Sequence, residues 1–218
     1  MGSITRSFAN NIGTSGILKA GAFNNASLNN VTALNAAIAT GSMVLISSQT
    51  ASSSASISFT TGIDSTYKEY QFWFINCHPS ATSDPTFQSS TNGGSSYGVT
   101  ATTTTWGAYH TESDSAFDLA YDSVADVAQS TSFFRLNAWQ TVGNANDEQF
   151  SGCLTLFNPA STTYVKHFIS RIITGSSTVQ PDLYTAGYFN TTSAINAVQF
   201  KMSSGNIDDR TILMYGIK

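Results

Sequence analysis

The sequence has few charged side chains, since Asp, Glu, Lys and Arg make up only 10% of its 218 residues. An average soluble domain has about 25%. A composition this poor in charge disfavours a helical enzyme or a coiled-coil rod. The nine basic residues stand singly, without a run or a stripe. Because nucleic-acid binding depends on clustered Lys and Arg, we expect no nucleic-acid partner.

Long apolar runs are also missing, and no stretch approaches the roughly 20 residues needed to cross a bilayer. We therefore expect no membrane association. The N-terminal residues MGSITR lack the apolar segment of a signal peptide. Arg6 stands where a myristoylation signal has Ser or Thr. These features predict a protein that is not exported through a signal peptide and matures where it is made.

Cysteine is scarce, with only Cys77 and Cys153 in the chain. A chain of this length can bury about 70% of its unfolded surface, so it needs no disulfide scaffold. Two interpretations remain for the pair. We favour two small buried hydrophobic side chains, and the alternative is a disulfide.

Neutral polar and aromatic residues are abundant, with 32 Ser, 28 Thr, 16 Asn and 14 Phe. Thr and aromatic side chains favour extended structure. From Met43 onward, short β-type segments alternate with turn residues such as Asn92-Gly93-Gly94. The expected strands are Met43–Ser48, Ala55–Thr60, Glu69–Cys77, Thr86–Ser90, Tyr97–Thr105, Ala116–Tyr121, Ser132–Trp139, Gln149–Asn158, Thr162–Ile172, Leu183–Phe189, Ala197–Ser203 and Thr211–Ile217. This pattern predicts an all-β fold, a two-sheet antiparallel β-sandwich of the jelly-roll type.

Residues 70–75 (YQFWFI) are apolar on both faces of their expected strand. Such a strand is packed on each side or is covered by a neighbouring subunit. Tyr70, Phe72 and Phe74 are therefore candidate packing or oligomer contacts. The four prolines, Pro79, Pro85, Pro159 and Pro181, are all expected in connections between strands.

The first 43 residues have a different character, because Phe8 and Phe23 are their only aromatic residues. A single helix is expected from Ser27 to Thr40, with Leu28, Val31 and Ile38 on one stripe as candidate oligomer contacts. A stripe this short is marginal alone. Residues 1–43 are thus either a poorly ordered tail or, as we favour, an attachment and oligomerisation arm. Residues 44–218 form the β domain.

No motif in the chain supports catalysis. Gly94-Ser95-Ser96-Tyr97-Gly98 has the letters of a nucleophile elbow, but the residues after it are β-type rather than helical. His78, His110 and His167 lie too far apart in sequence to suggest a zinc site. We therefore expect that the protein is not an enzyme and that it binds no cofactor and no metal.

Five acidic residues gather in one segment that contains no Lys or Arg. They are Glu112, Asp114, Asp118, Asp122 and Asp126. The dense alternation of a calcium loop is missing. We favour a solvated negative rim over a calcium site.

Trp106, Tyr109 and Trp139 are expected at strand ends or in polar loops. Exposed rings among Thr, Asn and Ser side chains could stack on sugars, so these three are candidate glycan contacts. They could equally fill the seams between subunits.

Several segments resemble one known family. Residues 195–207 (INAVQFKMSSGNI) and 211–218 (TILMYGIK) look like the last hairpin of jelly-roll domains in structural proteins of tailed bacteriophages. Residues 62–70 (GIDSTYKEY), 90–97 (STNGGSSY) and 152–157 (GCLTLF) are similar to earlier strands of that domain. The resemblance covers residues 43–218 and extends to virion appendage proteins of marine and cyanobacterial phages.

This resemblance implies a non-enzymatic virion protein displayed on the particle surface. We expect a capsid-attached knob or decoration protein, joined to other virion proteins by its N-terminal arm. The alternative is a short tail fibre or receptor-binding protein that binds host surface glycans. The resemblance also implies a homotrimer, because jelly rolls of virion appendages often meet around a three-fold axis.

Overall fold

The computed structural model describes residues 42–176 and 178–218. The expected helix Ser27–Thr40, with Leu28, Val31 and Ile38, lies outside these residues. The chain divides into two units, Met1–Thr40 and Gly41–Lys218. Among the described residues, no helix is long and apolar enough to cross a membrane.

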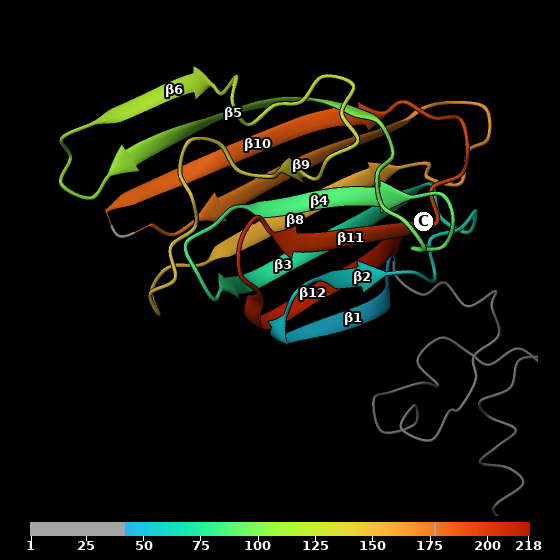
Figure 1. Ribbon diagram of the computed structural model, residues 1–218, viewed down its shortest axis with the longest axis horizontal. Helices are drawn as coiled ribbons and strands as arrows, with labels where there is room; N and C mark the ends of the chain where they lie inside the picture. The colour runs from blue at the N-terminus through green and yellow to red at the C-terminus, as the bar shows by residue number, and fades with distance from the viewer. Residues whose placement is uncertain (1–41, 177) are drawn as a thin grey trace, which may run out of the picture. The chain divides into compact units, whose positions relative to one another are not determined.

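Twelve strands form two antiparallel sheets, so the predicted all-β sandwich is confirmed (Figure 1). The strands are β1 (Met43–Ser54), β2 (Ile57–Phe59), β3 (Glu69–Pro79), β4 (Pro85–Ser90), β5 (Ala101–Thr111), β6 (Phe117–Tyr121), β7 (Phe134–Arg135), β8 (Phe150–Phe157), β9 (Lys166–Thr174), β10 (Val179–Phe189), β11 (Ala197–Met202) and β12 (Ile207–Ile217).

The two sheets differ in size. The large sheet has eight strands in the order β1-β12-β3-β8-β9-β10-β5-β6, and the small sheet has four in the order β2-β11-β4-β7. From β1 to β5, consecutive strands alternate between the sheets, which is how a jelly roll is wound. Figure 1 shows β5 and β6 extending beyond the small sheet.

Each expected strand corresponds to one in the structure, with differences at the ends. The segment expected from Ser132 to Trp139 pairs only through Phe134 and Arg135. The prediction that the prolines lie in connections was wrong for Pro79, which ends β3, and for Pro85, which begins β4. It was also wrong for Pro181, which lies inside β10. There it pairs with Tyr109 of β5, while the ladder to β9 begins only at Asp182. A proline without an N–H fits where the neighbouring strand has ended.

Phenylalanine side chains join the two sheets. Phe87 of the small sheet is fully buried, and its ring lies 5.2 Å from that of Phe200 in a stacked arrangement. It also lies within 5.7 Å of the rings of Phe134, Phe168 and Phe189. Aromatic pairs of this kind contribute about 0.5–1.5 kcal/mol each beyond the burial of their area. The phenylalanine residues that are abundant in the sequence are thus concentrated in the core.

Strand β3 lies inside the large sheet, between β12 and β8. Tyr70, Phe72 and Phe74 point into the core and are at most 2% exposed. Of the two roles expected for these three residues, the structure shows core packing. The alternating residues Trp73 and Ile75 lie on the outer face, where they are 41% and 45% exposed.

Both cysteines are free, so the structure contains no disulfide between them. Cys77 is buried, and Cys153 is partly buried on β8. Burial raises the pKa of the Cys77 thiol to about 12 and that of Cys153 to about 11. Because the thiolate is the reactive form, both side chains are weak nucleophiles near neutral pH.

Candidate functional site

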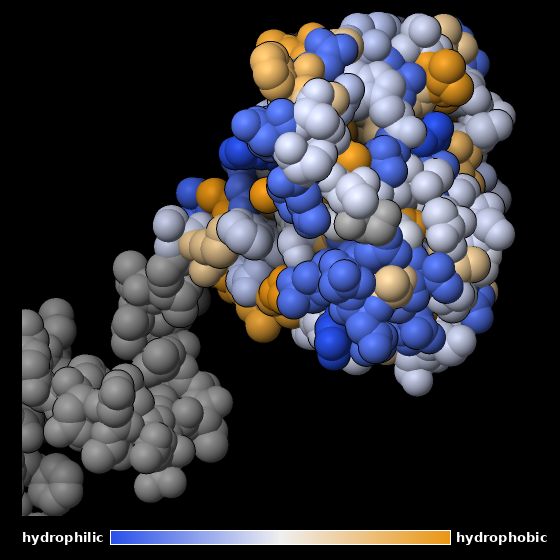
Figure 2. Space-filling view, turned by 90° about the vertical axis from the view of Figure 1, so that its left-hand side faces the viewer, coloured by the Kyte–Doolittle hydropathy of each residue, from blue (hydrophilic) through white to orange (hydrophobic). Residues whose placement is uncertain are grey.

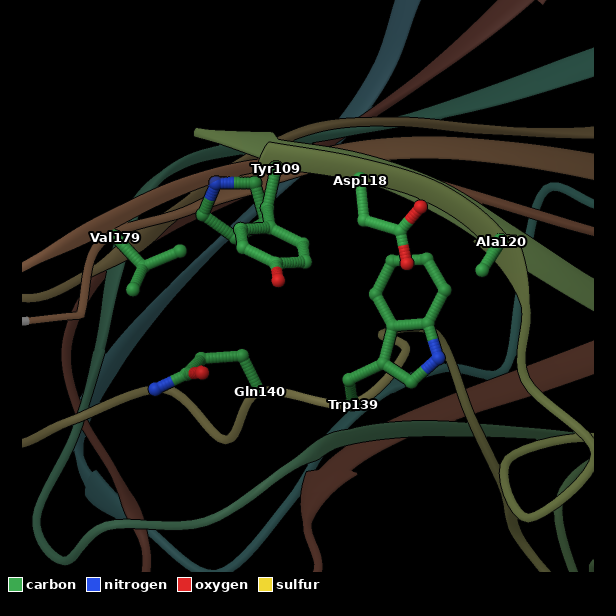
Figure 3. A pocket seen from close by; sticks show the side chains of 7 residues that line it. Tyr109, Asp118, Ala120, Trp139, Gln140 and Val179 are labelled. Atoms are coloured by element: carbon green, nitrogen blue, oxygen red, sulfur yellow. The ribbon is translucent and has the colours of Figure 1, made fainter. Parts of the chain in front are cut away.

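A cleft of about 470 Å³ opens where the large sheet extends past the small one. Its walls are the inner faces of β5, β6 and β10 on one side and the segment after β7 on the other (Figure 3). The residues that line it are Tyr109, Asp118, Ala120, Trp139, Gln140, Val179 and Pro181.

Two of the three aromatic residues singled out in the sequence meet in this cleft. The ring centroids of Tyr109 and Trp139 lie 6.3 Å apart, and the rings are inclined at 69°. Figure 3 shows both rings bordering the same space, one from β5 and one from the opposite segment. The third residue, Trp106, lies on the other face of the large sheet. An offset of three along a strand reverses the direction of the side chain, so Trp106 and Tyr109 point to opposite sides.

Trp106 takes part in a separate stack on the outer face. Its ring is parallel to that of Tyr184, with centroids 4.3 Å apart and an interplanar angle of 3°. The Arg171 guanidinium lies 5.3 Å from the Tyr184 ring. Asp182 holds this guanidinium through two hydrogen bonds of 2.9 and 2.7 Å.

A buried carboxylate positions Trp139. Asp122 is 4% exposed, and its Oδ2 accepts a 2.6 Å hydrogen bond from the Trp139 backbone N–H. Its Oδ1 accepts from the N–H groups of Val124 and Ala125 at 2.8 and 3.1 Å. Burial opposes ionisation of Asp122, but these three donors together with Arg135 outweigh it and lower the pKa. Asp122 is therefore a charged anchor for the cleft rather than part of a solvated rim.

Further hydrogen bonds fix the segment that carries Trp139. The Asn137 amide donates to Asp84 at 2.7 Å and to the Gln140 carbonyl at 2.8 Å. The Gln140 amide donates to Ser176 Oγ at 2.6 Å. Trp139 itself has a positive φ of 40°, in the left-handed region that non-glycine residues seldom occupy. This backbone persists because its neighbours hold it in place.

The remaining acidic residues of the 112–126 segment separate from one another. Asp118 lines the cleft, and its Oδ1 accepts from the Leu119 N–H at 2.8 Å. Asp114 pairs with His110 at 3.0 Å, and Asp126 accepts a hydrogen bond from Tyr121. Within residues 42–176 and 178–218, no three His, Cys, Asp or Glu side chains come together as metal ligands.

The other candidate motifs also stay apart. His78 contacts the Ala145 carbonyl at 3.1 Å, whereas His167 lies 6.2 Å from the Tyr188 ring. Ser96 of the elbow-like motif accepts a 2.9 Å hydrogen bond from the Asn92 side chain. That motif lies in the loop between β4 and β5, which is not the strand-to-helix turn on which a nucleophile elbow depends.

The outer face of the large sheet is a second candidate surface. Directly paired residues form an aromatic-rich row across it, which runs from Leu213 through Trp73, Cys153, Arg171, Tyr184 and Trp106 to Tyr121. The large apolar side chains that are exposed on this face are Met43, Leu45, Trp73, Ile75, Trp106, Phe117, Leu119, Tyr121, Ile169 and Ile173. Figure 2 shows hydrophobic residues at the top of the domain, where β6 lies.

The charges at the centre of this outer face neutralise each other, because Arg171 and Asp182 form a bidentate pair. The sequence did not indicate that Asp118 and Gln140 line the cleft or that Asp122 supports Trp139. A local signal exists only for Asp122. An Asp followed two and three residues later by Val124 and Ala125 is typical of a turn in which the Asp side chain accepts from nearby N–H groups.

No known protein family, curated protein or solved structure matches this chain at a significant level.

Proposed function

We propose that this chain is a non-enzymatic structural protein of a phage virion, displayed on the particle surface as a capsid-attached knob or decoration protein. Residues 1–43 attach it to other virion proteins, and the β-sandwich forms the displayed part. In this role the sandwich assembles with copies of itself, as a homotrimer. The observation that carries the proposal is the apolar outer face of the large sheet.

The size of this face suits a subunit interface. Eight strands spaced about 4.8 Å apart and about nine residues long cover roughly 1,000 Å². A stable interface needs about 800 Å² per partner. Within this area lie several exposed apolar side chains, among them Trp73, Ile75 and Ile169, and large exposed apolar patches on soluble proteins usually mark a contact with another molecule. The Arg171–Asp182 pair leaves the centre of the face without net charge, so copies can approach without repulsion there.

A charge placed on this face tests the proposal. We expect the intact protein to have a solution mass of about three times 23.2 kDa. Ile169, which is 52% exposed at the middle of the face, is the position to change. Ile169→Lys would bury an unpaired charge in the interface, so we expect it to give a monomer in multi-angle light scattering.

The control is Tyr164→Lys, which changes a more exposed aromatic residue, 70% accessible, in the loop before β9 and should leave the mass unchanged. A wild-type protein that is monomeric at all concentrations would overturn the assembly through this face.

Deleting residues 1–41 tests the attachment role separately. The shortened chain keeps all of β1, and we expect it to fold but not to join particles.

A further inference from the structure

We propose that the cleft between Tyr109 and Trp139 is a saccharide-binding site that accepts neutral or amino-bearing sugar rings and rejects acidic ones. This goes beyond the structural role proposed above and does not depend on it. The cleft lies on the inner side of the β5–β6 overhang, whereas the assembly surface is the outer face of the same sheet. A ligand in the cleft therefore leaves the proposed interface free.

The shape of the cleft fits one or two sugar rings. Its volume of about 470 Å³ lies in the lower part of the range of small-molecule sites, about 300–1,000 Å³. Tyr109 and Trp139 form two adjoining walls inclined at 69°. Val179 and Pro181 add apolar surface. A sugar ring can lay its C–H face on one aromatic wall while its hydroxyl groups point to the polar side chains.

The polar groups of the cleft are two acceptors, the Asp118 carboxylate and the Gln140 carbonyl, and two donors, the Tyr109 hydroxyl and the Trp139 indole N–H. Asp118 uses one carboxylate oxygen for the Leu119 N–H, which leaves the other oxygen for a ligand. The Gln140 amide nitrogen is engaged by Ser176, so its carbonyl oxygen is the group offered to a ligand. Sugar hydroxyl groups, which both donate and accept, match these groups, and a protonated amine can donate to the two acceptors.

Charge narrows the choice of sugar. None of the seven residues that line the cleft is Lys, Arg or His, and Asp118 is the only one of them with a carboxylate. A protonated amine pairs with that carboxylate, whereas the carboxylate of a uronic acid meets it without a counter-ion. Asp118 therefore attracts amino sugars to the cleft and repels acidic sugars.

The site is organised before a ligand binds. Asp122 fixes the Trp139 backbone, and the contacts of Asn137 and Gln140 fix the segment on either side. A wall that is already held in place loses little conformational entropy on binding. The left-handed backbone of Trp139 is an observed outlier of the kind that concentrates at binding sites.

Titration of the full-length protein with methyl glucoside, glucosamine and glucuronate tests the proposal. The readouts are the NMR signals of the Trp139 indole N–H and of the Gln140 side-chain amide, at constant ionic strength and neutral pH, and the Gln140 signal reports binding by Trp139→Ala. We expect shifts with methyl glucoside and glucosamine, tighter binding of glucosamine, and no shift with glucuronate. Trp139→Ala should weaken binding of both ligands at least tenfold, by order of magnitude, because it removes a wall of the cleft.

Two further variants separate the parts of the argument. Asp118→Asn should weaken glucosamine about two- to fivefold, the worth of an exposed ion pair, and leave methyl glucoside unchanged. Trp106→Ala, on the opposite face, should leave both affinities unchanged. Circular dichroism and thermal melting of each variant show that its fold is intact.

Three results would overturn the assignment. The first is that none of the three sugars shifts the indole signal. A shift by a lysine-containing peptide in place of the sugars would count as this result, because it would indicate a protein partner. The second is glucuronate binding as tightly as glucosamine. The third is an equal loss of affinity in Trp106→Ala and Trp139→Ala.

Discussion

Asp122→Ala is the substitution that most directly tests how the cleft is built. It removes a buried carboxylate that accepts three backbone hydrogen bonds, from Trp139, Val124 and Ala125. A hydrogen bond to a charged group contributes about 1.5–3 kcal/mol. The N–H of Val124 can regain a partner in water, because Val124 is 81% exposed, whereas Ala125 is buried. We therefore expect a loss of about 2–4 kcal/mol in the free energy of unfolding.

Urea denaturation measures this loss as a lower midpoint at an unchanged slope. The matched control is Asp118→Ala, an exposed acid on the same segment, which should change stability by no more than about 0.5 kcal/mol. Asp122→Asn separates the contacts, since an amide can still accept from Val124 and Ala125 but turns its NH₂ toward the Trp139 N–H. An intermediate loss is expected. Equal stability of Asp122→Ala and Asp118→Ala would refute this account.

The pH dependence of the same contact has a definite sign. The pKa of Asp122 in the folded protein lies below its ordinary value of 3.8. Its stabilising contribution is therefore complete above about pH 4–5 and is lost as the pH falls through the folded-state pKa. The stability difference between the wild-type protein and Asp122→Ala should shrink below pH 4, as followed by urea midpoints.

Two other predictions concern the core. Phe87→Ala removes a fully buried ring that contacts four others and should cost about 3–5 kcal/mol in urea denaturation; a loss below 1 kcal/mol would show that the sheets are not joined there. At alkaline pH, the unfolded Cys77 thiol ionises near pH 9, whereas the folded one keeps its proton to about pH 12. Its contribution to stability is full below pH 9 and is lost above it, by about 1 kcal/mol at pH 10. Cys77→Ala should flatten this part of the stability–pH curve, and an unchanged curve would contradict the burial of the thiol.

Local patterns carried much of the fold. Alternating apolar residues such as Val198, Phe200 and Met202 mark one buried strand face, and turn residues mark the strand ends. Because these signals need only neighbouring residues, the twelve strands and the sandwich class followed from them. The placement of Pro181 did not, because it depends on where β9 ends beside β10.

The cleft was partly predictable. Trp106, Tyr109 and Trp139 are expected at strand ends or in polar loops, which is right for Trp139 and wrong for Trp106 and Tyr109, because β5 extends to Thr111. That Tyr109 and Trp139 meet, while Trp106 lies on the outer face, depends on β5 lying opposite the segment after β7. The parity of positions 106 and 109 along one strand could have separated the two.

By itself, the amino-acid sequence determined a β-rich chain with neutral polar surfaces, a phenylalanine core and a different N-terminal region. Periodicity and composition express these properties residue by residue. The tertiary structure alone decided the strand order, the aromatic-rich outer face, and the burial of Asp122 beneath Trp139. Those features arise from pairing between residues far apart in the chain, such as Trp73 with Cys153 and Arg171 with Tyr184, which no local pattern encodes.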